Sequence, residues 1–442
     1  MTAPVSRGIA WIGLYLAVVL LPLGVALFVR LSSGATVPLL HGLAVAAGLV
    51  AFSLLTMQFG LVARIKSAAR PFGSDALALF HRLLGSAALG FIVAHSVFLI
   101  ASGLPLDSLS PVSINASTSL GATSLWLTIL LIAASLWRKR LRLRYGLWQA
   151  SHSLIAVLAV LAALGHVLEA TSARQDGLLA IVLTAYAVLF LALLLDYRVL
   201  RPLRLQRRPW VLVENRDEGA STRTLVLRPV GHEGLSFEPG QFAWLSTGSS
   251  AFGFDQHPLS LSGPTEPATV PLEFSIKALG DWSSKIVPQL VPGAKVYVDG
   301  PYGAFTPDRV PAQSFVLIAG GIGITPMRSI LLTLRARGDN RRVLLIHAAH
   351  DPGRAIFREE LAGLARTMNL VLVPVYESPP PDWRGERGLI SMDLLRRHLP
   401  PSLAHVQFFV CGPPAMIEDV ESALSRLGIR PEQFQSERFD LV

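Results

Sequence analysis

Cysteine is almost absent from this sequence of 442 residues, which contains only Cys411. A single thiol excludes a disulfide within the chain, and it excludes zinc sites that need several cysteines. Charged residues are also scarce, at 16% of the total, whereas hydrophobic residues make up 51%. The basic residues behind the net charge of +9 cluster beside long apolar runs, where they orient membrane segments. We therefore expect a membrane protein of two or three folded units, and no nucleic acid as a partner.

Six apolar runs are each long enough to span a bilayer, which takes about 17–25 helical residues. They all lie in the first 200 residues, and after about Leu205 the composition becomes that of ordinary soluble protein. The first run follows Arg7 as in a signal peptide, but its length and the lack of a clear small-residue cleavage site favour a retained helix. The expected spans are 9–29, 39–62, 76–101, 120–137, 148–168 and 178–200.

Basic residues gather in alternate loops of this membrane half, at 64–70, 138–144 and 201–208. The other loops hold only Arg30 and Arg174. Cytoplasmic loops of membrane proteins carry the excess of lysine and arginine. The sequence therefore predicts an integral protein of the cell or inner membrane, with its N-terminus and its soluble half in the cytoplasm.

The third and fifth expected helices each carry two histidines fourteen residues apart, His81 with His95 and His152 with His166. Fourteen residues is nearly four helical turns, so both imidazoles lie on one face, about 21 Å apart along the axis. Because the two helices run in the same direction, His81 lies level with His152 and His95 with His166. A single intramembrane histidine is often only a packing residue. A matched quartet instead predicts two haems, each held by two histidines and suited to passing electrons.

Three other residues of the membrane half are weaker candidates. Arg30 ends the first helix on the outer side, where it would pair with a haem propionate or act as an interfacial arginine. His41 lies near the outer end of the second helix without a matched histidine. Phe91 lies between the two histidine levels and would either pack against its surroundings or shorten the electron path.

The soluble half contains two groups of motifs that are typical of dinucleotide sites. In the first group, a strand-like piece from His257 to Ser262 would place alternate side chains on one side of a barrel wall. A lysine and a predicted helix start follow, where free N–H groups can hold a pyrophosphate. The candidate residues are His257, Pro258, Leu259, Ser260, Ser262, Lys277, Gly280, Trp282 and Ser283.

In the second group, the buried strand 315–319 leads into a glycine loop, and the apolar strand 407–410 ends in a second short loop. Both loops would meet at the carboxyl edge of a parallel sheet, where ligands bind. We expect Thr325 as the N-cap and Pro326 as the first residue of the helix after the first loop. The loop residues are Gly320, Gly321 and Gly323 in the first loop, and Cys411, Gly412 and Pro413 in the second.

In the order of these motifs the chain resembles the ferric reductase and NADPH oxidase superfamily over nearly its whole length, in particular bacterial flavocytochromes b similar to NADPH oxidase. The resemblance implies a multidomain fold. A six-helix transmembrane haem-binding bundle at 1–206 would be followed by a ferredoxin-reductase-like pair. This pair would consist of an FAD-binding β-barrel at 207–308 and an α/β domain for NADH or NADPH at 309–442.

The resemblance also assigns roles to single residues. His81, His95, His152 and His166 would be the ligands of two b-type haems. The residues of the first motif group would contact FAD, and the glycine loop with Thr325 and Pro326 would hold the nicotinamide nucleotide. Cys411, Gly412 and Pro413 would lie near its reactive ring, and Phe439, which three further residues follow, would be the aromatic residue that covers the flavin. The residues expected to act in catalysis are therefore Cys411 and Phe439.

NADH and NADPH both remain open as electron donors. Relatives that prefer NADPH often carry an arginine just after the strand that corresponds to 343–347, where this chain has His350 and Asp351. The carboxylate of Asp351 would disfavour a 2′-phosphate, whereas Arg354 would supply positive charge.

The expected activity is electron transfer from NAD(P)H through FAD and the two haems across the membrane. Dioxygen as acceptor would give superoxide or peroxide, and we favour this oxidase because the motifs at His257 and Gly280 are closest to that branch. A ferric chelate is the alternative acceptor, and an electron-relay subunit that serves a partner protein is another alternative. A transporter-like bundle with a regulatory nucleotide domain would contain no haem. No calcium-binding loop or recruitment segment is visible, so we expect constitutive activity without an obligate protein partner.

Overall fold

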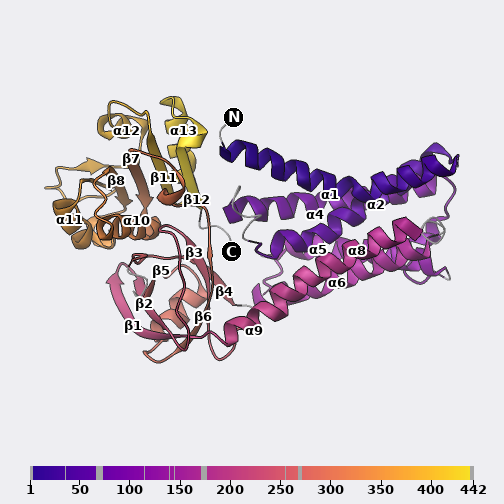
Figure 1. Ribbon diagram of the computed structural model, residues 1–442. Coiled ribbons are helices and arrows are strands. Elements are labelled where there is room, and N and C mark those ends of the chain that lie inside the picture. The colour runs from indigo at the N-terminus through magenta and orange to yellow at the C-terminus, as the bar shows by residue number, and fades with distance from the viewer. Residues whose placement is uncertain are drawn as a thin grey trace. The chain divides into compact units, whose positions relative to one another are not determined.

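The computed structural model describes residues 3–34, 36–65, 73–113, 115–138, 140–143, 145–170, 177–253, 255–266 and 271–438. The chain divides into two compact units, Met1–Pro202 and Leu203–Val442, whose elements are labelled in Figure 1. Each unit has its own hydrophobic core.

The first unit is a bundle of long apolar helices. The described part of the chain contains six helices long and apolar enough to cross a membrane, so the prediction of six spans is confirmed. The last of them continues through a π-helical turn, Asp196–Leu200, into the short helix α9, Arg201–Gln206. The long helices are α1 Ala3–Ser33, α2 Leu39–Val62, α4 Gly73–Ala101, α5 Ala116–Leu136, α6 Tyr145–Glu169 and α8 Gly177–Leu195.

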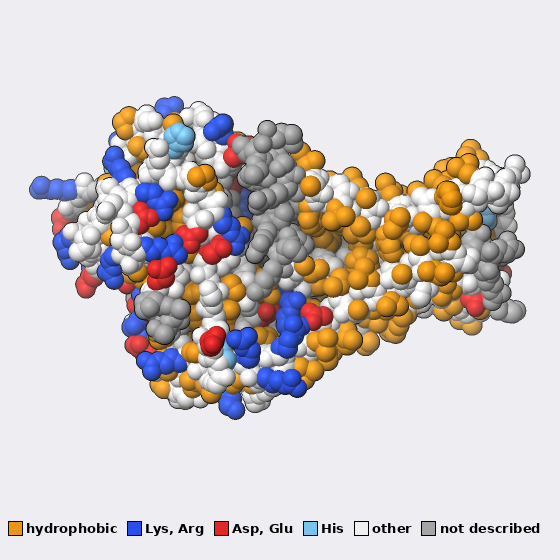
Figure 2. All heavy atoms as spheres, viewed as in Figure 1, with side chains coloured by type: hydrophobic (Ala, Val, Ile, Leu, Met, Phe, Trp, Pro, Cys, Tyr) orange, Lys and Arg blue, Asp and Glu red, His pale blue; other side chains and the backbone are white. Residues whose placement is uncertain are grey.

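The outer surface of the bundle is apolar, as a lipid solvent requires. Large side chains such as Phe28, Leu83 and Ile181 are exposed, and Figure 2 shows hydrophobic side chains along the helices. Helix α2 is the most enclosed, and its Ser53 and Thr56 are fully buried. Both hydroxyls donate to carbonyl oxygens one turn earlier in the same helix, so no polar group of these two side chains is left unsatisfied in the bundle.

The second unit begins with an antiparallel sheet of six strands in the order β4-β3-β6-β1-β2-β5. A bridge between Leu261 and Phe274 joins the two ends of this order, as in a closed barrel. Alternate side chains such as Leu212, Leu225 and Leu245 are fully buried inside it. The strands are β1 Trp210–Gly219, β2 Thr222–Pro229, β3 Phe242–Thr247, β4 Gln256–Ser260, β5 Leu272–Lys277 and β6 Lys295–Tyr302.

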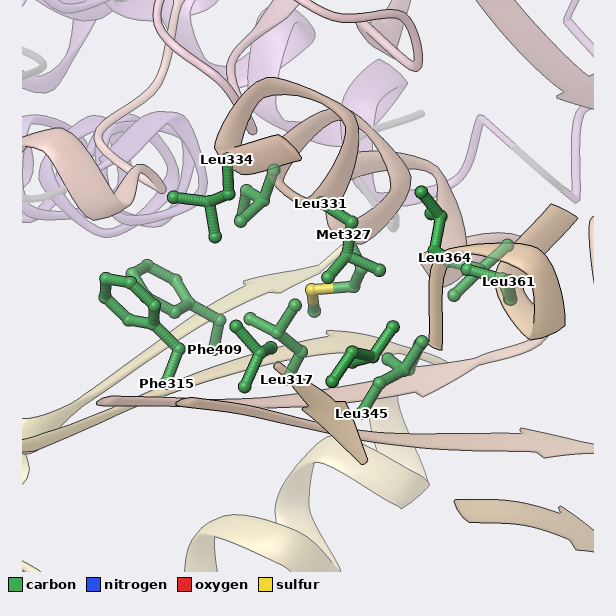
Figure 3. Close-up of a cluster of buried hydrophobic side chains, with 14 of the residues drawn as sticks. Phe315, Leu317, Met327, Leu331, Leu334, Leu345, Leu361, Leu364 and Phe409 are labelled. Atoms are coloured by element: carbon green, nitrogen blue, oxygen red, sulfur yellow. The ribbon is translucent and has the colours of Figure 1, made fainter. Parts of the chain in front are cut away.

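A parallel sheet of six strands follows, in the order β10-β9-β8-β7-β11-β12. Two helices cover each face, which is the doubly wound arrangement. Figure 3 shows one face, where Leu317 and Leu345 of the sheet pack beneath Met327 and Leu361 of the covering helices. The strands are β7 Ser314–Gly320, β8 Arg342–Ala349, β9 Leu370–Tyr376, β10 Glu386–Arg387, β11 Val406–Gly412 and β12 Phe434–Arg438. The helices are α10 Ile324–Ala336 and α11 Arg358–Thr367 on that face, and α12 Met392–His398 and α13 Pro414–Arg426 on the other.

Candidate functional site

The four histidines of the first unit form two facing pairs between α4 and α6. The ring centroids of His81 and His152 lie 6.2 Å apart, and those of His95 and His166 lie 5.9 Å apart. Two imidazole nitrogens that each lie about 2 Å from one metal atom have ring centroids roughly 6 Å apart. The spacing of both pairs therefore fits one iron atom between two imidazoles. Among the described residues, no group of three or more His, Cys, Asp or Glu forms a metal site of another kind.

The hydrogen bonds of these histidines leave Nε2 for the metal. His95 Nδ1 lies 2.7 Å from the carbonyl oxygen of Ala44, and His166 Nδ1 lies 2.7 Å from that of Ser117. Because a carbonyl only accepts, each Nδ1 carries the proton and each Nε2 keeps its lone pair. A hydrogen bond from the ring nitrogen that does not bind the metal generally orients metal-binding histidines. We call His95 and His166 the outer pair, and His81 and His152 the inner pair, after the sides that the basic loops predict. The inner pair is less constrained, because the nearest partner of His152 Nδ1 is Ser135 Oγ at the longer distance of 3.3 Å. His81 Nδ1 has no partner within the described part of the chain.

Two glycines make room for the outer pair. A Cβ atom on Gly48 would lie 2.8 Å from His95 Nδ1, and a Cβ atom on Gly121 would lie 2.9 Å from His166 Nδ1. Contacts this short force a neighbour to move. Each imidazole therefore reaches its carbonyl acceptor only because the adjacent helix has no side chain at that position.

A cavity lies between the helices at the outer level and is bordered by both outer histidines. It is lined mainly by apolar side chains, including Leu49, Phe52 and Ile92. No Asp, Glu, Lys or Arg occurs among its lining residues in the described ranges. The histidine spacing, the Nδ1 acceptors and this apolar cavity together fit a haem held by His95 and His166.

The weaker candidates of the membrane half lie at helix ends or on the outside of the bundle. Arg30 bends back onto the start of α2, where its Nη2 donates to the carbonyl oxygen of Val37 at 3.4 Å. His41 is exposed at the end of that helix. Phe91 is also exposed, at 41%, so the structure places its ring on the outside of the bundle. A lipid-facing role of Phe91 is therefore favoured over a role in the electron path.

In the second unit, His257 and Trp282 form an aromatic pair at the antiparallel sheet. Their rings stack with centroids 3.9 Å apart and planes 19° apart. Trp282 Nε1 donates to Thr247 Oγ1 at 3.1 Å, which fixes the indole. Burial lowers the pKa of His257 to about 4, so the ring is neutral at pH 7. The buried His257 Nε2 and Ser260 Oγ have no partner in the described ranges, so these polar atoms fit a bound FAD.

Other predicted FAD residues already have partners of their own. Ser262 is fully buried, and its Oγ lies 2.9 Å from Ser275 Oγ in a hydroxyl chain across the sheet. The helical turn after Asp281 is a π-turn at Trp282–Ile286, and Ser283 Oγ accepts from the backbone N–H of Gly280 at 3.0 Å. The sequence suggested that the N–H of Gly280 would be free to bind a pyrophosphate. In the structure this N–H is already taken by Ser283. Lys277 Nζ instead points toward the glycine loop, 4.0 Å from a Cβ built on Gly321.

The two predicted loops of the parallel sheet meet where the strand order reverses, at the ends of β7 and β11. A Cβ atom on Gly323 would lie 2.2 Å from the carbonyl oxygen of Cys411, and one on Gly320 would lie 2.5 Å from Met416 Sδ. Only glycine fits this approach, so the crossing offers backbone rather than side chains to a ligand. Cys411 itself is fully buried. Carboxyl edges of this kind bind nucleotides.

The helix after the glycine loop begins earlier than predicted. Gly323 is the N-cap and Ile324 the first helical residue, so Thr325 and Pro326 lie inside the first turn. The hydroxyl of Thr325 donates to the carbonyl oxygen of Ile322 at 3.0 Å and caps no amide. Proline is tolerated there because first-turn N–H groups have no helical acceptor. The prediction of Thr325 as the N-cap is thus wrong by two residues.

Beyond β8, the loop that would meet the adenosine end of a nucleotide carries one carboxylate and one arginine, which pair with each other. Asp351 Oδ1 accepts from the N–H of Arg354 at 3.0 Å, and its Oδ2 lies 3.4 Å from Arg354 Nε. His350 Nδ1 lies 3.1 Å from Glu377 Oε2. The arginine that would favour NADPH is therefore paired with the carboxylate that disfavours it. Phe439, the predicted flavin cover, lies outside the described residues.

Sequence patterns gave no indication of several residues that the structure brings to these sites. Gly48 and Gly121 each lie four residues after the carbonyl that binds the histidine, a spacing that could have marked them as small residues on one helix face. Arg328, on α10, is the most buried of the ion-paired arginines in the described part of the second unit, with its side chain 7% exposed. No sequence signal distinguishes it from other helix arginines.

Comparisons with known proteins agree with both halves of this description. Residues 47–163 match the family described as ferric reductase like transmembrane component, and residues 317–422 match the oxidoreductase NAD-binding domain. The chain is 32% identical over 186 residues to NADH-cytochrome b5 reductase 1 of Pyricularia oryzae, covering 41% of this chain and 60% of that protein. It is 27% identical over 241 residues to the flavohemoprotein of Bacillus subtilis, covering 52% and 59%. The chain thus spans about three fifths of these relatives.

Among solved structures, a flavohemoglobin of Malassezia yamatoensis with bound FAD and heme is similar in fold, with a TM-score of 0.50 and 19% identity. The match covers 90% of this chain and 96% of that one. These matches define an integral membrane protein with a reductase module of the FAD- and NAD-binding fold. A ferric-reductase-like transmembrane domain followed by an oxidoreductase NAD-binding domain is the combination that the resemblance predicted, so that prediction is confirmed.

Proposed function

We propose that this chain is an NAD(P)H oxidase that moves electrons across a membrane from NAD(P)H to dioxygen, forming superoxide or peroxide. The observation that carries the proposal is the stacking of two facing histidine pairs on the same two helices, each spaced for one iron atom. When bound, FAD would divide the electron pair of a hydride into single electrons, and two b-type haems would carry these through the bilayer.

The residues of the chain would hold and orient these groups. His81 with His152 would ligate the inner haem, and His95 with His166 the outer haem. Neutral His257 would offer an uncharged nitrogen to FAD, because its pKa of about 4 leaves it unprotonated at pH 7. The crossing of the two loops would present backbone N–H groups to the nucleotide. The basic loops favour a cytoplasmic reductase module and an acceptor on the outer side.

The motifs at His257 and Gly280, which are closest to the oxidase branch, support dioxygen over a ferric chelate as acceptor. A ferric chelate that is reduced at the rim, or a partner protein that takes the electron, is the alternative that the experiment below separates.

Sealed vesicles with the full chain in one orientation test this proposal. NADH and NADPH are added on the reductase side, with superoxide probes on each side and ferric citrate supplied on the opposite side. The proposal expects oxygen consumption, and superoxide on the side opposite NAD(P)H. His166→Ala should abolish this product while flavin reduction persists, and His41→Ala should leave both unchanged. Faster reduction of ferric citrate than of oxygen would favour the reductase. Reduced haem that neither acceptor reoxidises would favour the relay.

A further inference from the structure

Arg328 joins the flavin sheet to two helices of the nicotinamide domain. Its Nε and Nη2 donate to the two carboxylate oxygens of Glu360 on α11, at 2.6 and 3.0 Å. Its Nη1 donates to Glu273 Oε2 on β5 at 2.7 Å and to the carbonyl oxygen of Ser262 at 2.8 Å. The planar guanidinium therefore has donors engaged in two directions at once, one toward α11 and one toward the barrel.

The surroundings of this guanidinium are enclosed. The side chain of Arg328 is only 7% exposed, and the ring of Phe357 lies 4.7 Å from its Cζ. Phe357 occupies the left-handed region, with φ of 60°, directly before α11. That conformation is costly for a bulky residue. The fold therefore accepts local strain where the ring covers the guanidinium.

Burial alone would lower the pKa of Arg328, but the hydrogen bonds and charges of Glu360 and Glu273 raise it above its usual value. The guanidinium therefore stays charged. Removing one partner of such a buried pair leaves an uncompensated charge and is strongly unfavourable. The arrangement of the three side chains is thus tightly defined.

Each element that Arg328 joins leads directly to a predicted cofactor contact. Ser262 ends the segment that begins at His257, and β5 runs from Leu272 to Lys277, whose Nζ points toward the glycine loop. Helix α10 starts immediately after Gly323 in that loop. Arg328 thus lies about one turn from the nucleotide loop, and it contacts β5 and the segment that follows β4.

Further along α10 the two domains touch again. Thr333 is fully buried, and its Oγ1 accepts from the N–H of Thr265 at 3.1 Å. Arg337 donates to Glu266 Oε1 at 2.8 Å and to Asp308 Oδ1 at 2.7 Å, with its side chain 31% exposed. Exposed pairs are screened and contribute little. Of the two arginines that join α10 to the barrel here, Arg328 is therefore the one with a buried ion pair, and it also binds α11.

We propose that Arg328 is a positioning residue that locks the flavin sheet against α10 and so sets the alignment of nicotinamide and flavin for hydride transfer. This inference rests on the proposed function, because it assumes that NAD(P)H reduces FAD in this module. Misplacement by about 1 Å can slow a transfer by roughly a hundredfold without loss of binding. The expected signature is a lower limiting rate with little change in affinity.

The test uses the purified full chain loaded with FAD, as wild type, Arg328→Gln and Arg328→Lys. Arg341→Gln is the matched control, because Arg341 donates to Asp339 and to the carbonyl oxygen of Ala312, which both lie inside the nicotinamide domain. Anaerobic stopped-flow absorbance gives the limiting rate of flavin reduction and the half-saturating NADH concentration. Hydrogen exchange of the segment 262–266 reports the docking of α10 directly, and FAD fluorescence reports its affinity.

Arg328→Gln should lower the limiting rate by about 30- to 100-fold, with half-saturation changed by less than about threefold. Exchange of 262–266 should accelerate, and FAD affinity should stay within about threefold of wild type. Arg328→Lys should recover part of the rate. Its ammonium group can bind a carboxylate, but it cannot reach Glu360 and Glu273 together as the planar guanidinium does. If Arg328→Gln does not fold, the limiting rate of Arg328→Lys decides whether Arg328 positions the cofactors.

A wild-type limiting rate in both Arg328 variants would overturn the inference, as would a loss explained fully by weaker NADH or FAD binding. Arg341→Gln with the same loss would also overturn it, because the effect would then belong to any arginine of the domain. If wild type itself shows no flavin reduction by NADH or NADPH, the proposed function fails. Hydrogen exchange would still decide whether Arg328 locks the two domains together.

Discussion

His95 on α4 and His166 on α6 face each other with ring centroids 5.9 Å apart, and the neighbouring helices seat them in the same way. Each imidazole is bonded through Nδ1 to a backbone carbonyl and lies against a glycine four residues further along that helix. The carbonyl and the glycine are those of Ala44 and Gly48 for His95, and those of Ser117 and Gly121 for His166. Helices α2 and α5 thus each provide a carbonyl acceptor and a glycine in the same arrangement. This arrangement turns both Nε2 atoms to the space between the rings.

We predict that Gly121→Ala lowers haem content from two to about one per chain. The new Cβ would lie 2.9 Å from His166 Nδ1 and would displace the imidazole from its carbonyl acceptor. Alanine favours helices over glycine by about 1 kcal/mol, so a loss of helix stability cannot explain the result. Gly90→Ala is the control, because a Cβ there meets nothing within 4 Å. Haem extraction and quantitation per chain is the measurement, and two haems in the Gly121 variant would contradict this account of the outer site.

The nucleotide preference should depend on Asp351. Its carboxylate pairs with Arg354 and would repel the 2′-phosphate of NADPH. We expect wild type to prefer NADH, and Asp351→Ser to raise kcat/KM for NADPH relative to NADH about tenfold, which corresponds to roughly 1.4 kcal/mol. Steady-state kinetics with both nucleotides checks this. An unchanged ratio would show that the 2′ position binds elsewhere on the sheet edge.

His347 should make the second unit less stable in acid. Its side chain is 3% exposed, and burial lowers its pKa to about 4, below the ordinary value of 6.5. The unfolded chain therefore binds more protons between these two values, so stability is fully present above about pH 6.5 and is lost as the pH falls toward 4. This group alone should cost about 2 kcal/mol between pH 7 and pH 5.

The urea midpoint of the second unit, measured at pH 7 and at pH 5, tests the role of His347. The wild-type midpoint should fall as the pH is lowered, and His347→Gln should show a smaller fall because glutamine does not titrate. The midpoint at pH 5 is compared with the midpoint of the same protein at pH 7, which removes the effect of the substitution itself on stability. Equal losses in the two proteins would assign the acid sensitivity to other groups, His257 among them.

The large features of the fold could be predicted because they depend on long, repeated patterns. Six apolar runs require helices in lipid, and the fourteen-residue spacing of the histidines fixes their faces on any regular helix. The glycine loop and the strand before it were likewise visible, because a phosphate loop needs glycine where backbone approaches closely. These signals are local in sequence and independent of tertiary contacts.

The features that could not be predicted depend on contacts between distant segments. Gly121 matters only because His166 packs against it, and the sequence alone does not reveal that neighbour. The start of α10 was misplaced because Thr325 resembles an N-cap, although its hydroxyl bonds to Ile322 inside the turn. Likewise, Ser283 occupies an amide that was expected to be free. In each case a side chain found a partner that propensity rules do not include.

We expect NAD(P)H to reduce two haems through a flavin in this one chain. The most direct measurement is an anaerobic absorption spectrum of the purified full chain with FAD, before and after NADH or NADPH is added. We expect flavin bleaching followed by a reduced b-type spectrum that corresponds to two haems per chain, and rapid reoxidation when oxygen is admitted. A chain that bleaches its flavin but shows no haem band would contradict it, and would leave a flavin reductase joined to a membrane bundle of another purpose.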